Sequence, residues 1–416
     1  MVATVQEIDK KYNVRPFVEA PTSLAKLDTI TLDAIDFSFD ESKESLPSRQ
    51  KLAAKLENSL TRIGFTAIIN HGIDTETFSH LRSIAQSVCD LPIDVQKQYL
   101  AGAWKSDLED RSKSLGGERG SGFKPRGYWS MQNGVEDSIV HYNFNKMLHK
   151  EFFDLSKNKQ PELVQAHLPE IQQYFHHIHT SILRKLTILC DLILELPEGY
   201  IWENYFKPIE GDFQNSGTGF GRFMKYQKMN PDDQKKVNNN WLRGHSDSGG
   251  FTFITSQPIL SLQIRDYHTG QWKYVDHIPN AFIVNVGDAF EFITGGYFKS
   301  AIHRVVAPPP DQARYTRLVL IYFSGPKNTS ILDPEPLNSP KLKRLGIVKP
   351  TEWEKITFAQ WNDEKATLFG KKKVNDQQGD EPALVLVYGR LHERWHQAEG
   401  NFTLEEARKR FKVIEI

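Results

Sequence analysis

The stretch GHSDSGGFTFI (244–254) decides which fold and which chemistry the chain is expected to have. His245 and Asp247 stand one residue apart, just before an apolar run that is typical of a strand. A second histidine, His303, follows in SAIHRVVA (300–307) after a turn. Antiparallel strands can bring these two ends together. Two imidazoles and one carboxylate on one face of a metal leave three positions open, which suits a non-haem iron(II) ion that must bind oxygen and a co-substrate.

The surrounding segment, residues 217–326, consists of short β-rich runs separated by glycine, proline and aspartate. These runs are FGRFMKYQ (220–227), FTFITS (251–256), LSLQIRD (260–266), WKYVDH (272–277), AFIVNVGD (281–288), SAIHRVVA (300–307) and RLVLIYFSGP (317–326). Many short strands with turn signals between them predict a barrel or a sandwich.

Helices are expected on either side of this β-rich segment. Apolar spacing predicts helices at 48–64 and 74–90 and a long helix at 160–196. The tail is expected to be helical at 353–366 and again at 383–412. We therefore divide the chain into an N-terminal region of helices and strands (1–215), a β-rich domain that holds the metal motif (216–330) and a C-terminal extension (331–416).

The composition excludes several classes of protein. The chain has 416 residues, with 52 Lys and Arg against 52 Asp and Glu, so the basic surplus of a nucleic-acid-binding protein is absent. No apolar run approaches the ~18 residues that are needed to cross a membrane. Cys89 and Cys190 are the only two cysteines, which excludes a disulfide framework and favours a cytoplasmic location.

Two other histidine groups fit metal patterns less well. HHIH (176–179) falls in the expected long helix without a nearby carboxylate or cysteine, so we interpret it as the surface of an amphipathic helix. HERWH (392–396) matches the H-E-x-x-H pattern of zinc peptidases, in which two histidines lie one helical turn apart. Because little chain follows to supply a third ligand, we interpret this motif as a surface helix.

The quoted segments together resemble the Fe(II)- and 2-oxoglutarate-dependent dioxygenases, in the isopenicillin N synthase-like branch. The N-terminal TITLDAIDF (29–37) and RIGFTAIINHGI (62–73) agree with that resemblance. It implies a mainly β fold with flanking helices around a double-stranded β-helix, or jelly-roll, core. It also implies that His245, Asp247 and His303 are the iron ligands.

The resemblance implies an oxygenase that hydroxylates, desaturates or cyclises a small organic molecule, with a place in secondary metabolism. Fe(II), 2-oxoglutarate and O2 are the expected cofactor and co-substrates, supported by ascorbate, and 2-oxoglutarate is decarboxylated to succinate and CO2. Two alternatives stay open: an iron oxidase of the isopenicillin N synthase type, which needs no 2-oxoglutarate, and a binding protein that keeps this fold without the chemistry.

The distal carboxylate of 2-oxoglutarate needs an arginine, whose planar fork binds a carboxylate through two hydrogen bonds. The usual Arg-x-Ser of the family is altered here, and two arginines compete. Arg314 keeps the Arg-x-hydroxyl form, whereas Arg317 keeps the spacing to Phe323 at the end of the strand. We favour Arg317, because the alternative needs an insertion inside a central strand. Tyr226 matches a tyrosine that contacts the co-substrate in relatives.

Substrate contacts are expected from residues around the metal motif. Met224 shares a strand face with Tyr226 and is expected to line the pocket. Phe251 and Phe290 favour an apolar or ring-bearing substrate, and Arg126 and His141 are further candidates for contact with it. The 331–416 extension is expected either to cover the barrel mouth as a lid or to form homodimer contacts.

Overall fold

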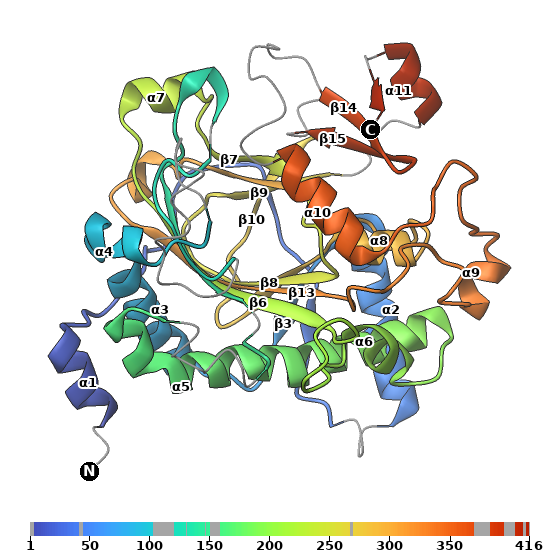
Figure 1. Cartoon of the computed structure of the whole chain (residues 1–416), viewed down its shortest axis with the longest axis horizontal. Helices are drawn as coiled ribbons and strands as arrows, with labels where there is room; N and C mark the ends of the chain where they lie inside the picture. Colours follow the sequence, from blue (N-terminus) through green and yellow to red (C-terminus); the bar gives the residue numbers. More distant parts are fainter. Residues whose placement is uncertain are drawn as a thin grey trace.

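Two β-sheets form the centre of the molecule in the computed structural model (Figure 1). The structure describes residues 4–40, 45–102, 120–129, 131–145, 147–149, 159–266, 269–369, 383–394, 404–410 and 413–415. The order of the larger sheet is β2 (Ala34–Asp36), β3 (Phe65–Ile69), β11 (Phe282–Val286), β8 (Phe251–Thr255), β13 (Arg317–Gly325), β6 (Thr218–Tyr226), β5 (Ile139–Asn145) and β4 (Gly122–Lys124). The order of the smaller sheet is β1 (Thr29–Ile30), β10 (Trp272–Val275), β9 (Leu262–Arg265), β12 (His303–Val306) and β7 (Asn240–His245).

The predicted fold class, mainly β with flanking helices, is confirmed. Strands from both sides of residue 215 share the larger sheet, so the proposed N-terminal region and the β-rich domain are joined by hydrogen bonds between strands. The helical segments of the main body are α1 (Val5–Tyr12), α2 (Leu46–Arg62), α3 (Thr75–Cys89), α4 (Ile93–Gln98), η2 (Gln132–Gly134), α5 (Glu162–His177), η4 (Ile178–Leu183), α6 (Arg184–Leu194), η5 (Trp202–Phe206), α7 (Pro231–Lys236), α8 (Asp288–Ile293) and η6 (Pro310–Gln312). No helix in these described ranges or in the described tail combines the length and the apolar character needed to cross a membrane.

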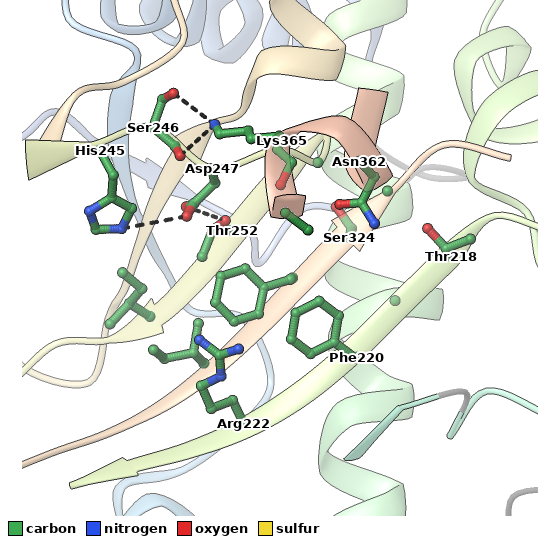
Figure 2. Close-up of a pocket in the computed structure, with 18 of the residues that line it drawn as sticks. Thr218, Phe220, Arg222, His245, Ser246, Asp247, Thr252, Ser324, Asn362 and Lys365 are labelled. Atoms are coloured by element: carbon green, nitrogen blue, oxygen red, sulfur yellow. Dashed lines mark hydrogen bonds and ion pairs between the residues drawn. The ribbon is translucent and has the colours of Figure 1, made fainter. Parts of the chain in front are cut away.

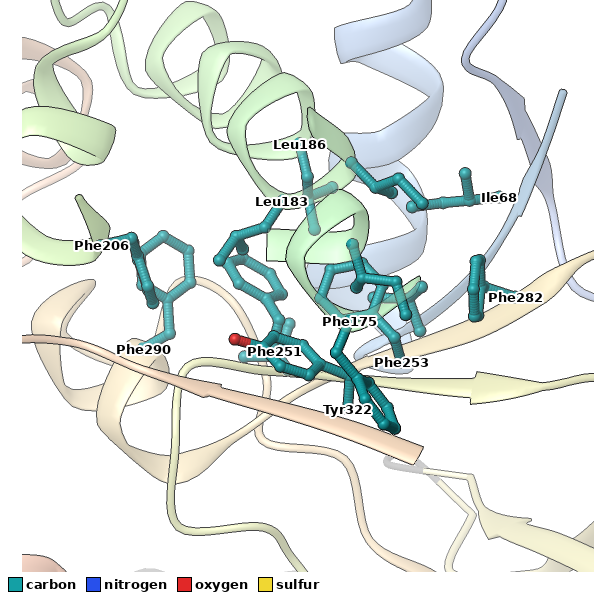
Figure 3. Packing of buried hydrophobic residues seen from close by; sticks show 14 of the residues in the cluster. Ile68, Phe175, Leu183, Leu186, Phe206, Phe251, Phe253, Phe282, Phe290 and Tyr322 are labelled. Atoms are coloured by element: carbon teal, nitrogen blue, oxygen red, sulfur yellow. The ribbon is translucent and has the colours of Figure 1, made fainter. Parts of the chain in front are cut away.

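The expected long helix runs from α5 through a π-helical turn, η4, into α6, and it covers one face of the larger sheet (Figure 1). Its apolar side chains, such as Phe175 and Leu186, pack on rings that rise from the strands, such as Tyr322 (Figure 3). A glycine on β6 permits the close approach, because a Cβ at Gly221 would lie 2.4 Å from the Phe175 ring. This packing leaves the opposite face of β6 turned toward the space between the sheets.

The HHIH motif was predicted to lie on a helix surface, and this is wrong for His179. His179 is fully buried beneath β13. Its Nε2 donates to the Phe206 carbonyl at 2.8 Å, and its Nδ1 accepts from the Tyr322 hydroxyl at 2.8 Å. Burial lowers the pKa of His179 to about 4, so the ring is neutral at pH 7. His179 therefore joins the long helix to the sheet.

The helical prediction for 383–412 is wrong for 383–394 and holds only for α11. This part of the tail forms a small three-stranded sheet of β15 (Arg390–Arg394), β14 (Ala383–Val387) and β16 (Val413–Glu415), with α11 (Leu404–Arg410) before the last strand. The HERWH motif begins on β15, so it lacks the helical turn that a zinc-peptidase pattern needs, and His396 lies outside the described residues. The interpretation as a surface helix fails too, because His392 and Glu393 are buried. The remaining helices of the extension are α9 (Pro340–Arg344) and α10 (Phe358–Phe369).

Candidate active site

A cavity of about 540 Å³ opens between the two sheets (Figure 2). Strands of both sheets line it, chiefly β6 and β13, together with the turn after β7, and α10 and β15 of the C-terminal extension also contribute. The cavity contains all three residues of the predicted metal motif. It is also lined by the charged side chains of Arg222, Arg317, Lys365 and Glu393.

The predicted metal ligands meet because β7 ends where β12 begins. His245 is the last residue of β7 and pairs directly with His303, the first residue of β12. Their rings lie with centroids 4.2 Å apart, and Asp247 follows β7 by two residues. One donor atom from each of the three lies within 4.8 Å of the other two. This is the facial set that the sequence predicted.

Backbone carbonyls orient both imidazoles. The Nδ1 of His245 lies 2.8 Å from the Arg243 carbonyl, and the Nδ1 of His303 lies 3.1 Å from the Ala301 carbonyl. Because a carbonyl only accepts, each Nδ1 carries the proton and each Nε2 keeps its lone pair for a metal. Burial, and then the neighbouring His303, lower the pKa of His245 to about 4, so its ring is neutral at pH 7.

The carboxylate of Asp247 is oriented by two polar side chains from the larger sheet. Thr252 donates from Oγ1 at 2.6 Å and Asn285 donates from Nδ2 at 2.9 Å, both to Oδ2. Burial alone would raise the pKa of Asp247, but the two histidines and these hydrogen bonds outweigh burial and lower the pKa to about 2. The Oδ1 atom is left facing His245, at 3.9 Å from its Nε2. One negative charge and two imidazole lone pairs fit an iron(II) ion.

Arg317 lies in the cavity and Arg314 does not. Arg317 opens β13, pairs with Tyr226 of β6, and holds its guanidinium 4.5 Å from the centre of the Tyr226 ring. It is buried, and its Nη1 has no hydrogen-bond partner among the residues that the structure describes. Arg314 is exposed and donates to the Tyr315 hydroxyl at 2.9 Å. Of the two candidates, Arg317 is therefore the one placed to bind an anion in the cavity.

The predicted substrate residues divide into two groups. Met224 and His141 line the cavity, and the Tyr226 hydroxyl lies 3.5 Å from the Met224 sulfur. Phe251 and Phe290 lie instead in the hydrophobic core, where their ring centroids are 4.7 Å apart (Figure 3). Arg126 is exposed and outside the set of cavity-lining residues. The structure thus does not bring Phe251, Phe290 or Arg126 to the cavity.

Arg222 is a cavity residue that our sequence analysis missed. It lies on the same face of β6 as Met224 and Tyr226, so strict alternation along that strand was the signal that identifies it. Arg222 lies beside Phe220 (Figure 2), its guanidinium carbon lies 4.9 Å from the centre of the Phe323 ring, and its Nε donates to Asn143 at 2.8 Å. Burial lowers its pKa to about 10, and the group stays charged at pH 7.

Lys365, on α10, is the second residue that sequence reasoning missed. Its ammonium donates to the Ser246 carbonyl at 2.8 Å and to the Ser246 hydroxyl at 3.0 Å, and it forms an ion pair with Asp288 (Figure 2). Ser246 stands between two metal ligands. Asp288 begins α8 and is buried. No local pattern reveals this contact, because it joins segments far apart in the sequence.

Comparisons with known proteins agree with this geometry. A model described as the 2OG-Fe(II) oxygenase superfamily matches residues 221–326, and a model described as non-haem dioxygenase in morphine synthesis N-terminal matches residues 32–177. A 1-aminocyclopropane-1-carboxylate oxidase from Dictyostelium discoideum is 26% identical over 377 residues, covering 83% of this chain and 95% of that protein. A leucoanthocyanidin dioxygenase from Perilla frutescens is 23% identical over 338 residues, covering 80% of each.

Solved structures share the fold. The crystal structure of a full-length Neurospora crassa protein in complex with alpha-KG has a TM-score of 0.62 and 17% identity, covering 84% of this chain and 99% of that one. A dioxygenase for auxin oxidation from rice has a TM-score of 0.57 and 17% identity, covering 82% and 96%. These likenesses confirm the jelly-roll core around the cavity.

Proposed function

The chain belongs to the 2OG-Fe(II) oxygenase superfamily, and on that premise we propose which of its residues bind iron, 2-oxoglutarate and the substrate. Bound iron(II) supplies the activation of O2, coupled to decarboxylation of 2-oxoglutarate and oxidation of the organic substrate. His245, Asp247 and His303 would hold the ion at the wall of the cavity. The fixed Nδ1 contacts and the Thr252 and Asn285 hydrogen bonds keep these three ligands in place.

Arg317 binds the distal carboxylate of 2-oxoglutarate. The observation that supports this role is a buried guanidinium in the cavity whose Nη1 has no partner among the described residues. Burying a cation without an anion is costly, so such a site favours an anionic ligand. Tyr226 stacks against the guanidinium and limits its rotation. Val319, where relatives have a serine, leaves Arg317 and Tyr226 to bind that carboxylate.

Arg222 binds an acidic group of the substrate. When iron and 2-oxoglutarate are bound, the two positive charges of iron and the charge of Arg317 balance Asp247 and the two carboxylates of 2-oxoglutarate. The positive charge of Arg222 then has no anionic partner among these groups. Its nitrogens other than Nε have no hydrogen-bond partner in the described part of the chain. The rings of Phe220 and Phe323 stack beside it with centroids 4.6 Å apart. We therefore expect a small molecule with a carboxylate or similar anion next to an apolar or aromatic body.

Anaerobic titration with Fe(II) and then 2-oxoglutarate tests the co-substrate site. The weak visible charge-transfer band of the chelate should appear in the wild type and disappear in Asp247→Ala. It should require at least tenfold more 2-oxoglutarate in Arg317→Ala, while the matched control Arg314→Ala behaves like wild type. Iron binding without any band would instead favour an oxidase that does not need 2-oxoglutarate. This is the alternative function, because the Dictyostelium relative is named an oxidase.

Acid and ester pairs test the role of Arg222. Succinate release is measured over a panel of small aromatic and aliphatic carboxylic acids and their methyl esters. The wild type should prefer acids, and Arg222→Gln should lose that preference while keeping the visible band of the iron and 2-oxoglutarate complex. Equal turnover of an acid and its ester by the wild type would contradict an anionic substrate.

Location and assembly belong to the same proposal. A cytoplasmic site is supported by the two cysteines, which are both free and buried. A role in secondary metabolism is supported by the morphine-synthesis description of the N-terminal family model. The extension covers the cavity with α10 and β15, which favours the lid function over the homodimer contact that also stays a prediction.

A further inference from the structure

A second group of metal-binding side chains lies outside the cavity, where α1, α3 and α5 meet (Figure 1). Asp9 comes from α1, His80 from α3, and His167 and Glu170 from α5. One donor atom each from Asp9, His80 and His167 lies within 4.8 Å of the other two. Nothing in the oxygenase mechanism uses these residues.

Glu170 contacts the far nitrogen of both histidines. Its Oε1 lies 2.5 Å from the Nδ1 of His167, and its Oε2 lies 2.9 Å from the Nε2 of His80. A carboxylate only accepts, so the Nδ1 of His167 carries the proton of its hydrogen bond, whereas the Nε2 of His80 forms an ion pair with Glu170 without hydrogen-bond geometry and faces that carboxylate with its proton. The other nitrogens, His80 Nδ1 and His167 Nε2, then keep their lone pairs. They face Asp9, at 3.7 Å and 3.6 Å from its carboxylate oxygens.

The atoms that face one another in this group have no hydrogen-bond partner. His167 is fully buried, and neither its Nε2 nor the Oδ1 of Asp9 is hydrogen-bonded within the described ranges. A buried polar atom without a partner costs about 1–3 kcal/mol. A lone pair on an imidazole cannot hydrogen-bond to a carboxylate, since both accept. A cation between them satisfies both.

We propose that Asp9, His80 and His167 bind a divalent cation of the zinc class, and that Glu170 orients the two imidazoles. Two imidazoles, a carboxylate and a water make a tetrahedral set that zinc accepts. At Zn–N and Zn–O distances of about 2.0–2.1 Å, neighbouring donors in a tetrahedron lie about 3.3 Å apart. The 3.7 and 3.6 Å distances run to different oxygens of Asp9, and the three donors lie within 4.8 Å of one another, so a bound ion would draw them closer together than they are here. A carboxylate behind each ligating histidine is the arrangement that fixes its tautomer.

The charge of the group agrees with a dication. Asp9 and Glu170 carry two negative charges, and Glu76 on α3 adds to the negative field at His80. Neutral histidines leave these charges uncompensated, whereas a doubly charged ion balances Asp9 and Glu170. The competing arrangement is an ion-pair network without metal, in which His80 is protonated. The contact with Glu170 raises the pKa of His80 and thereby favours that arrangement in metal-free protein.

The ion would hold the N-terminal helix in place. No residue of α1 is buried, so apolar packing fixes this helix weakly. One ligand from α1, one from α3 and one from α5 would join this helix to the body of the protein. The site is structural, separate from oxygen chemistry, and it goes beyond the proposed function.

Zinc binding is measured on protein whose iron site has been removed. The background is His245→Ala/Asp247→Ala, which keeps a single iron-site histidine, and metal content is counted after equilibrium dialysis against zinc. We expect one zinc per chain in this background, and less than a tenth of that when Asp9→Asn and His80→Gln are added. His176→Ala, which removes an exposed histidine from the same helix α5, is the matched control and should keep the zinc.

Thermal unfolding separates metal binding from a loss of folding. Zinc should raise the Tm of the background and of the His176→Ala control by several degrees, and should leave the variant with Asp9→Asn and His80→Gln unchanged. Similar Tm values for all of these proteins in EDTA show that the added substitutions do not unfold the chain. The proposal is overturned if the background binds no zinc, or if zinc still binds after both ligands are replaced.

Discussion

At the scale of single residues, the proposed iron site depends on polar side chains inside otherwise apolar strands. Thr252 interrupts the apolar run FTFIT of β8, and Asn285 interrupts FIVNV of β11. Both are buried and both donate to the same oxygen of Asp247. A polar residue in a strand that is buried on both faces requires a hydrogen-bond partner. These two residues show where that partner is: the ligand carboxylate.

Replacing Thr252 with valine should weaken iron binding. The change removes one hydrogen bond from Asp247 and keeps the shape of the side chain, so the carboxylate is held less firmly. Loss of such a contact behind a metal ligand costs about ten- to hundredfold in metal affinity. Anaerobic Fe(II) titration measures the change. Thr187→Val is the matched control, because Thr187 is fully buried but donates only to a helix carbonyl of α6; an equal loss in this control would contradict the prediction.

Residue-level prediction from the sequence was most useful where a motif was local. His245, Asp247 and His303 were chosen because iron(II) prefers those residue types, and the structure brings the three together, while their role as ligands stays a prediction. Arg222 was missed although it occupies an alternate position of the strand that was already assigned. Phe251 and Phe290 were expected to contact the substrate but lie in the hydrophobic core, because the amino-acid sequence of a buried element does not show which of its faces packs against a helix.

At the scale of elements, His179 and Tyr322 connect the long helix to β13. The imidazole lies in the π-helical turn η4, and the phenol lies in the middle of the strand. The π-helical turn widens the helix at the point where the His179 ring contacts the sheet. Neither partner reaches water, since both are fully buried.

Tyr322→Phe should destabilise the protein without touching the cavity. It leaves the Nδ1 of His179 buried and unbonded, at a cost of about 1–3 kcal/mol in the free energy of unfolding. Urea denaturation measures this quantity. Tyr315→Phe is the control, because its hydroxyl contacts only the exposed Arg314. If Tyr322→Phe leaves the free energy of unfolding unchanged, the hydrogen bond makes no net contribution to stability.

Lys365 of α10 connects the extension to Ser246, in the turn between His245 and Asp247 that is called the metal turn below. Lys365→Met should lower stability by about 3–5 kcal/mol, because it leaves the Asp288 carboxylate buried and unpaired. It should also weaken iron binding through loss of the contacts to Ser246. The double variant Lys365→Met/Asp288→Asn should recover part of the stability, while the exposed Lys355→Met should match wild type. Additive losses in the double variant would show that the two residues are not coupled.

Prediction of elements was sound for the main body and for the helix expected at 353–366, which α10 confirms, and it failed for the first part of 383–412. Helices at 48–64, 74–90 and 160–196 have strong apolar periodicity, and each is present. In the tail, H-E-x-x-H suggested a helix, whereas the β-branched and apolar run ALVLV of β14 was the better signal. The contact of α10 with the metal turn depends on tertiary packing, so no local sequence pattern predicts it.

At the scale of the whole molecule, the cavity is built from segments that lie far apart in the chain. Strands of both sheets form its walls, and the extension passes back over them (Figure 1). Metal and 2-oxoglutarate are therefore expected to affect the core and the extension together.

Anaerobic hydrogen exchange tests this connection. Adding Fe(II) and 2-oxoglutarate should slow exchange in β7 and β12, and also in peptides that cover 358–369 and 383–394, because Lys365, His392 and Glu393 line the same cavity. Asp247→Ala should show none of these changes. Slower exchange in the strands with no change in the two extension peptides would contradict a covering role for the extension.

The position of Met224 affects the working lifetime of the enzyme. When an oxygenase turns over without substrate, stray oxidant is released inside its cavity, and sulfur is the most easily oxidised atom it meets. Both cysteine thiols are buried away from it, and burial raises the pKa of Cys89 to about 12, so neither is in its reactive form. Met224 instead faces the cavity beside Tyr226. Its sulfoxide would place a polar group in the substrate's path, so inactivation during idle turnover should begin at this one side chain.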